Sequence, residues 1–296
     1  MGEVPVMAAS EVIAMDADGA SAVRKMKDSS LVVAANAVRN GEAAAMFGAG
    51  NTGATMASAL LRMGRIKGVS RPAIATPIPT PGGEPTVLLD AGANADCSAS
   101  WIHQFAQMGA VYSRVRFGVE RPRVGLLSIG EESSKGNSLT KEVHALLADP
   151  RWAEAVGAEF VGNIEGRDLI GTGVADVAVT DGFTGNVALK TLEGSMKTLI
   201  SRLLAAFDAD DATREASATL WPALEPLYRE LDPNQTGGAM LLGIKGVCLI
   251  GHGSSSADGV CNAIRVASDL VESNLVAELT DAVGRVAAAE TDAPEQ

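Results

Sequence analysis

Six short apolar runs constrain the fold more than any other feature of the sequence. Each run ends in a polar segment that contains Gly, Asn or Asp; the runs occupy residues 43–50, 86–94, 123–132, 159–166, 174–182 and 247–253. Runs that are almost continuously apolar are typical of strands in a parallel sheet that helices cover on both faces. Helices are expected between or after them, at 31–40, 54–63, 98–117, 140–148 and 187–207. This alternation predicts an α/β fold with a mostly parallel sheet flanked by helices.

The length of 296 residues allows one large core. We expect a single α/β domain over residues 1–285, with a helical hairpin inserted at about 192–235 and a disordered tail at 286–296. In the hairpin, apolar residues recur at three- and four-residue spacings, which predicts one strongly apolar face. That face either packs in the core, pairs with a second copy of the chain, or makes shallow contact with a membrane.

Composition narrows the functional classes. No apolar run approaches the roughly 18 to 20 residues that a transmembrane helix needs, and the opening residues lack a secretory pattern, so we expect a cytoplasmic protein. A net charge of −12 disfavours nonspecific binding to nucleic acid. Cys97, Cys248 and Cys261 have no metal-ligand spacing and are odd in number, so we interpret them as reduced, packed thiols. We predict no metal site and no cofactor.

Two basic stretches depart from this acidic balance. Residues 62–71 carry four cations and no acid, and residues 114–123 carry four cations opposed by Glu120 alone. Either these are ordinary solvated surfaces, or they dock an acidic partner. In the first stretch the cations are Arg62, Arg65, Lys67 and Arg71.

A Gly-x-Thr-Gly turn occurs twice, at residues 50–53 and 182–185, each time after an apolar run and before an expected helix. Such a turn exposes backbone N–H groups at the positive end of the helix dipole, where an anion binds. Ordinary helix capping also accounts for the same residues. We expect the six polar strand ends to face one rim of the sheet, because ligands collect where the strands of an α/β sheet end.

Several catalytic patterns are missing. The sequence contains no Gly-x-Ser-x-Gly elbow and no phosphate-binding Gly-x-x-x-x-Gly-Lys loop. Residues 48–53 do satisfy Gly-x-Gly-x-x-Gly, a dinucleotide fingerprint, but Arg71 stands near the position where an acidic ribose ligand is expected. A nicotinamide-dependent dehydrogenase is therefore disfavoured.

Ten segments, in order from about residue 7 to about residue 275, closely resemble the bacterial phosphate acyltransferases of phospholipid synthesis, the PlsX family. They include GAGNTGATM, LLDAGANADC, RVGLLSIGEESSKGN, VADVAVTDGFTGNVALKTLEG and GVCLIGHGSS. The resemblance implies transfer of a fatty acyl group from acyl carrier protein to inorganic phosphate. It also implies a homodimer, peripheral membrane contact near the hairpin tip, and a fold like isopropylmalate dehydrogenases and phosphotransacetylases. Family members usually begin with a further βαβ-like portion that we do not find before Val4.

That reaction uses phosphate as the nucleophile, so the protein must hold the dianion against a thioester and stabilise the oxyanion. We expect the two turns to line one cleft, with Asn51, Thr52 and Gly53 on one side and Thr184, Gly185 and Asn186 on the other. Lys190 lies about one helical turn beyond Asn186 and is expected to neutralise developing charge. His252 is expected to protonate the departing thiolate. A solvated lysine and a histidine bonded within its own turn remain open alternatives.

Other residues join the candidate site with less defined roles. Asp181 either caps the following helix or orients Lys190, and Lys27 lies close enough to join an anion site. The family-like segments assign four further residues to the rim of the cleft: Glu131, Lys135, Asn137 and Arg167. Charge complementarity favours Arg65 and Lys67 as a docking site for the acidic carrier protein. The alternatives are a phosphotransacetylase acting on acyl coenzyme A, or an inactive homologue that serves as a membrane- or carrier-binding scaffold.

Overall fold

The computed structural model describes residues 4–80, 84–170, 173–230 and 236–291. Eight strands form one sheet in the order β1-β8-β7-β2-β3-β6-β4-β5. The strands are β1 (Ala45–Gly48), β2 (Ala73–Ile78), β3 (Thr86–Leu89), β4 (Arg123–Leu127), β5 (Glu159–Ile164), β6 (Val177–Val179), β7 (Ala239–Leu242) and β8 (Val247–Ile250). The six expected strands all form, and β2 and β7 are additional.

Ten α-helices accompany this sheet in the described residues. They are α1 (Gly19–Lys25), α2 (Ser30–Arg39), α3 (Thr52–Arg62), α4 (Ala99–Phe117), α5 (Ser138–Leu147), α6 (Pro150–Val156), α7 (Gly182–Phe207), α8 (Asp211–Glu230), α9 (Ala257–Glu272) and α10 (Leu275–Thr291). A short 3-10 helix spans Gly166–Leu169. Helix α10 continues past Arg285, where we expected the tail to begin, and residues 292–296 lie outside the described chain.

Helices cover both faces of the sheet, as the continuous apolar runs predict. Alternate strand residues point to opposite faces. Val177 and Val179 belong to the large core beneath α4, α5, α6, α9 and α10, whereas Ala178 belongs to a smaller core on the other face. That second face is covered by α2, α3 and the first turns of α7. The prediction of an α/β sheet flanked by helices is confirmed.

The direction of the strands departs from the expectation of one common rim. Pairs β1/β8, β3/β6, β6/β4 and β4/β5 are parallel, but β8/β7, β7/β2 and β2/β3 are antiparallel. Three reversals turn β3, β6, β4 and β5 against β1 and β8. The carboxyl ends of β1 and β8 therefore form one rim, the β1/β8 rim, and those of β3, β6, β4 and β5 form the opposite one, the β3/β6 rim. The expectation that all six ends share a rim is wrong, because β2 and β7 were not recognised.

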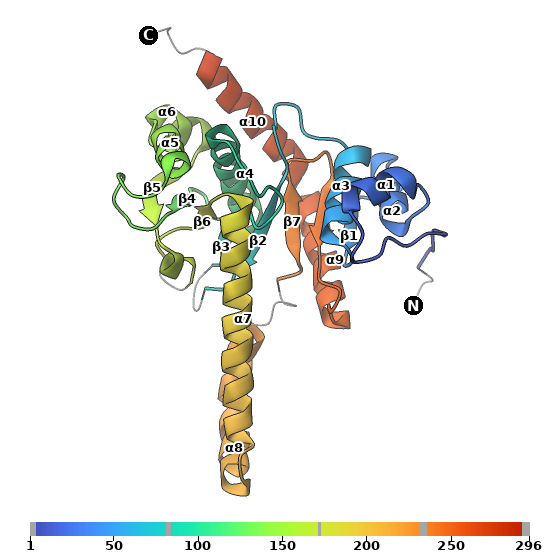
Figure 1. Cartoon of the computed structure of the whole chain (residues 1–296), viewed down its shortest axis with the longest axis vertical. Helices are drawn as coiled ribbons and strands as arrows, with labels where there is room; N and C mark the ends of the chain where they lie inside the picture. The colour runs from blue at the N-terminus through green and yellow to red at the C-terminus, as the bar shows by residue number, and fades with distance from the viewer. Residues whose placement is uncertain (1–3, 81–83, 171–172, 231–235, 292–296) are drawn as a thin grey trace.

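The helical hairpin projects from the body of the protein (Figure 1). Helix α7 runs unbroken for 26 residues from the end of β6, so the first arm of the hairpin is an extension of a helix that starts on the sheet. Leu192 packs against the core at the base of the hairpin, but farther out Leu199 is 71% exposed, and Leu203, Leu220 and Trp221 are also exposed. No described helix is both long enough and apolar enough to cross a bilayer.

The three cysteines have different surroundings. Cys248 is buried in β8, Cys97 is half-buried before α4, and Cys261 is exposed on α9. Burial raises the pKa of Cys248 to about 12 and that of Cys97 to about 11. The interpretation of all three as packed thiols is therefore wrong for Cys261, which lies on the solvent face of its helix.

Candidate functional site

The turn after β1 starts α3 with Asn51 as its N-cap. The Asn51 Oδ1 atom accepts the N–H of Ala54 at 2.9 Å, and its Nδ2 atom donates to the carbonyls of Ala14, Met15 and Ala17 at 2.9 to 3.1 Å. The amide group of Asn51 thus ties the segment before α1 to the start of α3, and its hydrogen bonds are used within the protein. The N–H groups of Thr52 and Gly53 belong to the first turn of the helix, where backbone donors have no partner within the helix.

The loop after β8 lies beside this turn. Gly251 N–H donates to the Gly48 carbonyl at 2.8 Å, and a Cβ on Gly253 would lie 3.5 Å from the carbonyl oxygen of Ala49. His252 is exposed, with Nδ1 2.6 Å from Ser254 Oγ and 3.3 Å from the Ser254 nitrogen that donates to it. Because Nδ1 is engaged by its own loop, Nε2 is the ring nitrogen that remains to meet a ligand.

The turn after β6 starts α7 with Asp181 as its N-cap. Asp181 Oδ1 accepts the Thr184 N–H and Oδ2 accepts the Thr184 hydroxyl, both at 2.8 Å. Of the two expected roles of Asp181, the structure therefore displays capping. The hydroxyl of Thr184 is a donor within the cap, so it does not point freely toward a ligand.

Asp90, which our sequence reasoning did not single out, supports this second turn. The side chain is fully buried, and its oxygens accept the N–H groups of Ile74, Gly92, Ala93 and Asn94 and the side-chain amide of Asn94, at 2.8 to 3.2 Å. A buried carboxylate with five donors fixes its loop strongly. The only sequence signal is an Asp placed directly after the apolar run of β3.

The loop that Asp90 fixes holds the start of α7. The Asn94 carbonyl accepts the Gly182 N–H at 2.8 Å, and a Cβ on Gly92 would lie 3.3 Å from Asn186. Gly185 packs so closely that an added Cβ would lie 2.0 Å from the Asp90 carbonyl oxygen. Asn186 is therefore positioned on the β3/β6 rim by its contact with this loop.

The two turns do not meet within one chain. Five strand spacings separate β1 from β6, which corresponds to about 24 Å, and the two strands end on opposite rims. The expectation that amides from both turns converge on one phosphate is wrong for this chain. The physical reason is the direction of the strands, which an apolar run does not encode.

Helix α7 nevertheless connects the two rims. Lys190 lies eight residues after Gly182, about 12 Å along the helix, which is close to the length of the short strands beneath it. Its neighbour Leu189 packs against the core cluster that contains Met46 and Ile250 of β1 and β8. Leu189 also packs against the cluster that contains Leu88 and Ala178 of β3 and β6, so this part of α7 spans the two halves of the sheet, about two helical turns beyond Asp181.

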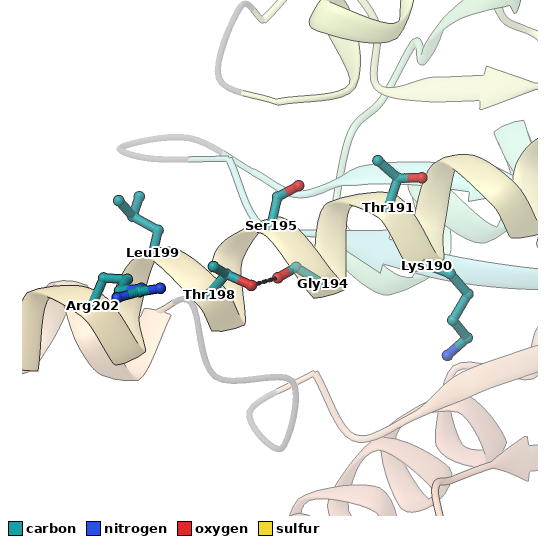
Figure 2. A pocket seen from close by; sticks show the side chains of 7 residues that line it. All are labelled: Lys190, Thr191, Gly194, Ser195, Thr198, Leu199 and Arg202. Atoms are coloured by element: carbon teal, nitrogen blue, oxygen red, sulfur yellow. Dashed lines mark hydrogen bonds between the residues drawn. The ribbon is translucent and has the colours of Figure 1, made fainter. Parts of the chain in front are cut away.

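An open hollow of about 610 Å³ follows this part of α7. Its lining residues all come from that helix: Lys190, Thr191, Gly194, Ser195, Thr198, Leu199 and Arg202. Figure 2 shows the small residues between the two long cations, with Lys190 directed to the side of α7 where the chain enters β7. The ammonium of Lys190 lies 2.7 Å from Glu193 Oε2. Thr191 and Ser195 point to the opposite side of the helix in the same view, and the Thr198 hydroxyl donates to the Gly194 carbonyl at 2.8 Å. The Lys190 ammonium is thus the group here that suits a phosphate-bearing ligand.

The remaining candidate residues lie elsewhere. On the β3/β6 rim, Arg167 pairs with Glu131 at 2.8 Å, and Asn137 caps α5 through the Thr140 N–H. Lys135 lies in the same loop after β4, whereas Lys27 is exposed between α1 and α2. The described residues contain no group of three His, Cys, Asp or Glu side chains that could hold a metal ion.

Known proteins resemble this chain closely in sequence. A family model described as a fatty acid synthesis protein matches residues 2–278. A phosphate acyltransferase from Elusimicrobium minutum is 47% identical over 271 residues, covering 92% of this chain and 77% of its own. One from Leptospira biflexa is 44% identical over 283 residues, covering 95% of this chain and 82% of its own. The chain belongs to the fatty acid synthesis protein family, the PlsX family of acyltransferases.

Solved structures share the fold at low sequence identity. The EutD phosphotransacetylase from Staphylococcus aureus aligns with a TM-score of 0.57 and 17% identity, covering 84% of this chain and 69% of its own. A phosphotransacetylase from Streptococcus pyogenes aligns with a TM-score of 0.56 and 16% identity, covering 85% and 70%. These likenesses establish the architecture alone.

Proposed function

We propose that this protein transfers a fatty acyl group from the thioester of an acyl carrier protein to inorganic phosphate, supplying acyl phosphate for phospholipid synthesis. The observation that carries the proposal is its identity of 43 to 47% with phosphate acyltransferases over more than nine tenths of the chain. The sequence also lacks a serine or cysteine elbow, which a phosphate nucleophile makes unnecessary.

The reaction assigns roles to the groups around the β1/β8 rim. A phosphate oxygen attacks the thioester carbonyl, the new C–O bond forms, and the C–S bond breaks. The N–H groups of Thr52 and Gly53 bind phosphate at the helix N-terminus, and Lys190 neutralises the developing oxyanion. His252 gives a proton to the departing thiolate through Nε2. Asn186, Asp181, Thr184 and Gly185 set the position of α7 and hence of Lys190.

Hydroxylamine trapping tests the reaction directly. With palmitoyl carrier protein and phosphate, the protein should yield a hydroxamate whose formation requires both substrates. Palmitoyl coenzyme A in place of the carrier separates this reaction from a phosphotransacetylase activity. Absence of hydroxamate with either donor, from a folded protein that binds the carrier, would favour the inactive scaffold.

Lys190 offers a sharper test because α7 contains a matched control. Replacing Lys190 with Ala should lower kcat on the order of a hundredfold, the usual loss when an electrostatic stabiliser of an oxyanion is removed. Lys197→Ala removes an exposed cation from the same helix outside the hollow and should change kcat less than about twofold. Equal rates for the two variants would remove Lys190 from the mechanism.

We also propose that the hairpin formed by α7 and α8 carries a homodimer contact and a peripheral membrane contact of this cytoplasmic protein. Its exposed Leu203 and Trp221 are the support for pairing. Light scattering should report a monomer for Leu203→Glu and a dimer for the control Ser201→Glu.

At the tip of the hairpin, Asp208, Asp210 and Asp211 oppose binding to an anionic bilayer. Vesicle flotation with Phe207 and Leu220 replaced by Ser decides whether the hairpin binds lipid.

A further inference from the structure

Four exposed cations form one surface that the sequence shows only in part. Arg65, Lys67 and Arg71 come from the connection between α3 and β2, and Lys245 comes from the turn between β7 and β8. The two segments are joined by backbone hydrogen bonds from Lys245 N–H to the Gly64 carbonyl at 2.9 Å and from Ile66 N–H to the Gly243 carbonyl at 3.0 Å. We name these four side chains the cationic surface.

None of these cations is neutralised by the described part of the protein. Within the described ranges, seven other cationic side chains form salt bridges: Arg116, Arg123, Arg151, Arg167, Lys190, Arg214 and Arg229. Acidic residues outnumber basic ones in this chain, which has a net charge of −12, so a group of four cations without acidic partners is unexpected. Their charge is available to an external partner.

Neutral groups hold this surface in place. Arg65 donates to the Ser70 carbonyl, and the guanidinium of Arg71 lies over the Trp101 ring, 4.7 Å from its centroid. Gln104 accepts the Ser70 N–H at 2.8 Å and donates to the Gly68 carbonyl at 3.0 Å. The connection is therefore anchored to α4 without acidic side chains, which preserves its positive potential.

We infer that the cationic surface docks the acidic protein that carries the acyl thioester. The inference rests on the proposed function, which requires such a donor. Charge complementarity accelerates encounter and fixes orientation in protein complexes. A membrane is a poorer fit, since most of the large exposed apolar side chains in the described residues lie on α7, α8 and residues 4–15, and none lies in the two segments that carry the four cations.

The cationic surface is physically connected to the start of α7. The Asn94 side chain donates to the Pro72 carbonyl, next to Arg71, at 2.9 Å. The Asn94 carbonyl in turn accepts the Gly182 N–H that begins α7. A donor bound here extends its thioester arm past this loop and along α7 toward Lys190. The surface thus gives the carrier a place outside the hollow while the arm enters it.

A double charge reversal tests the inference. Arg65→Glu with Lys245→Glu should weaken binding of palmitoyl carrier protein on the order of tenfold or more, measured by fluorescence anisotropy, and raise KM for the carrier in parallel without changing the dependence on phosphate. Wild-type affinity should fall with added salt, because the contact is exposed. The control Lys141→Glu, on the distant α5, should bind as the wild type does. A Gln/Gln pair at the same two positions gives a milder second variant, and circular dichroism verifies that each variant folds.

The outcomes separate the docking inference from the proposed reaction. If the wild type binds the carrier but makes no hydroxamate, the reaction fails, and the loss of binding in the reversed variant still supports the docking surface. If the wild type makes hydroxamate and the reversed variant keeps the same carrier affinity and KM, the docking surface is refuted while the proposed reaction stands. Loss of binding to phosphatidylglycerol vesicles with unchanged carrier affinity would assign the surface to lipid and also refute the inference.

Discussion

The turns after β1 and β6 share the pattern Gly-x-Thr-Gly but enter their helices at different positions. In the first, the N-cap is Asn51, the second residue of the pattern. In the second, the N-cap is Asp181, the residue before the pattern, so the helix starts two residues earlier. Thr52 is therefore the first helical residue of its turn, whereas the matching Thr184 is the third and is consumed by the cap.

This difference follows from what packs against each turn. The first turn is tied to the segment before α1 by the Asn51 amide, and its two glycines have space around them. The second is pressed against the loop that Asp90 fixes, and both of its glycines meet backbone or carboxylate atoms. Similar sequence therefore gives an open turn with donors at one rim and a packed turn at the other.

Replacing the matching glycines of the two turns with Ala should give the largest difference in unfolding free energy between the turns. A Cβ at Gly185 would lie 2.0 Å from the Asp90 carbonyl oxygen, and one at Gly182 would lie 2.5 Å from the Asn94 carbonyl oxygen, so each substitution should lower the free energy of unfolding by about 3 kcal/mol or more. Gly50→Ala meets no atom within 4 Å, and Gly53→Ala meets only ordinary contacts, so both should change it by less than about 1 kcal/mol. Urea unfolding measures all four variants. Equal losses at the two turns would contradict the contrast.

Removing the N-cap side chain of each helix should give a smaller difference in unfolding free energy between the two turns. Asn51→Ala removes a cap and three further hydrogen bonds and should cost about 3 kcal/mol of unfolding free energy. Asp181→Ala removes a partly exposed cap and should cost about 1 kcal/mol. Asn51→Asp keeps the acceptor but loses the donor, so it separates the tether from the cap. A larger loss of unfolding free energy for Asp181→Ala than for Asn51→Ala would contradict the role of the Asn51 amide in tying the segment before α1 to α3.

The rate at which each cysteine is alkylated reports how tightly its neighbouring turn is packed. Cys97 donates to the Asn94 carbonyl beneath the second turn, and Cys248 lies in β8, beside the first turn. Because burial raises the pKa of Cys97 from 9.0 to about 11, its thiolate at pH 8 should be about a hundredfold scarcer than that of an ordinary thiol. Alkylation at pH 8, followed by mass spectrometry, should modify exposed Cys261 first. Gly182→Ala should accelerate modification of Cys97 and leave Cys248 protected; equal acceleration of both would indicate global unfolding.

Part of the site was predictable and part was not. The Gly-x-Thr-Gly turns, the helix after each, and the position of Lys190 along its helix follow from local patterns, because caps and helical spacing involve residues close in sequence. Asp90 escaped notice because its local donors, in residues 92–94, form no recognised motif, and its fifth donor, the Ile74 N–H, becomes a neighbour only when the β3 loop folds against β2. Lys245 was missed for the same reason, since a long chain separates it from Arg65.

The sequence by itself determined the alternation of strands and helices, the family, and the residues that end each strand, because these depend on hydrophobic periodicity and short-range hydrogen bonding. Only the tertiary structure decided which strand ends share a rim. The antiparallel β2 and β7 in the middle of the sheet reverse half of it, and strand direction is a property of pairing between distant segments, which no local pattern encodes.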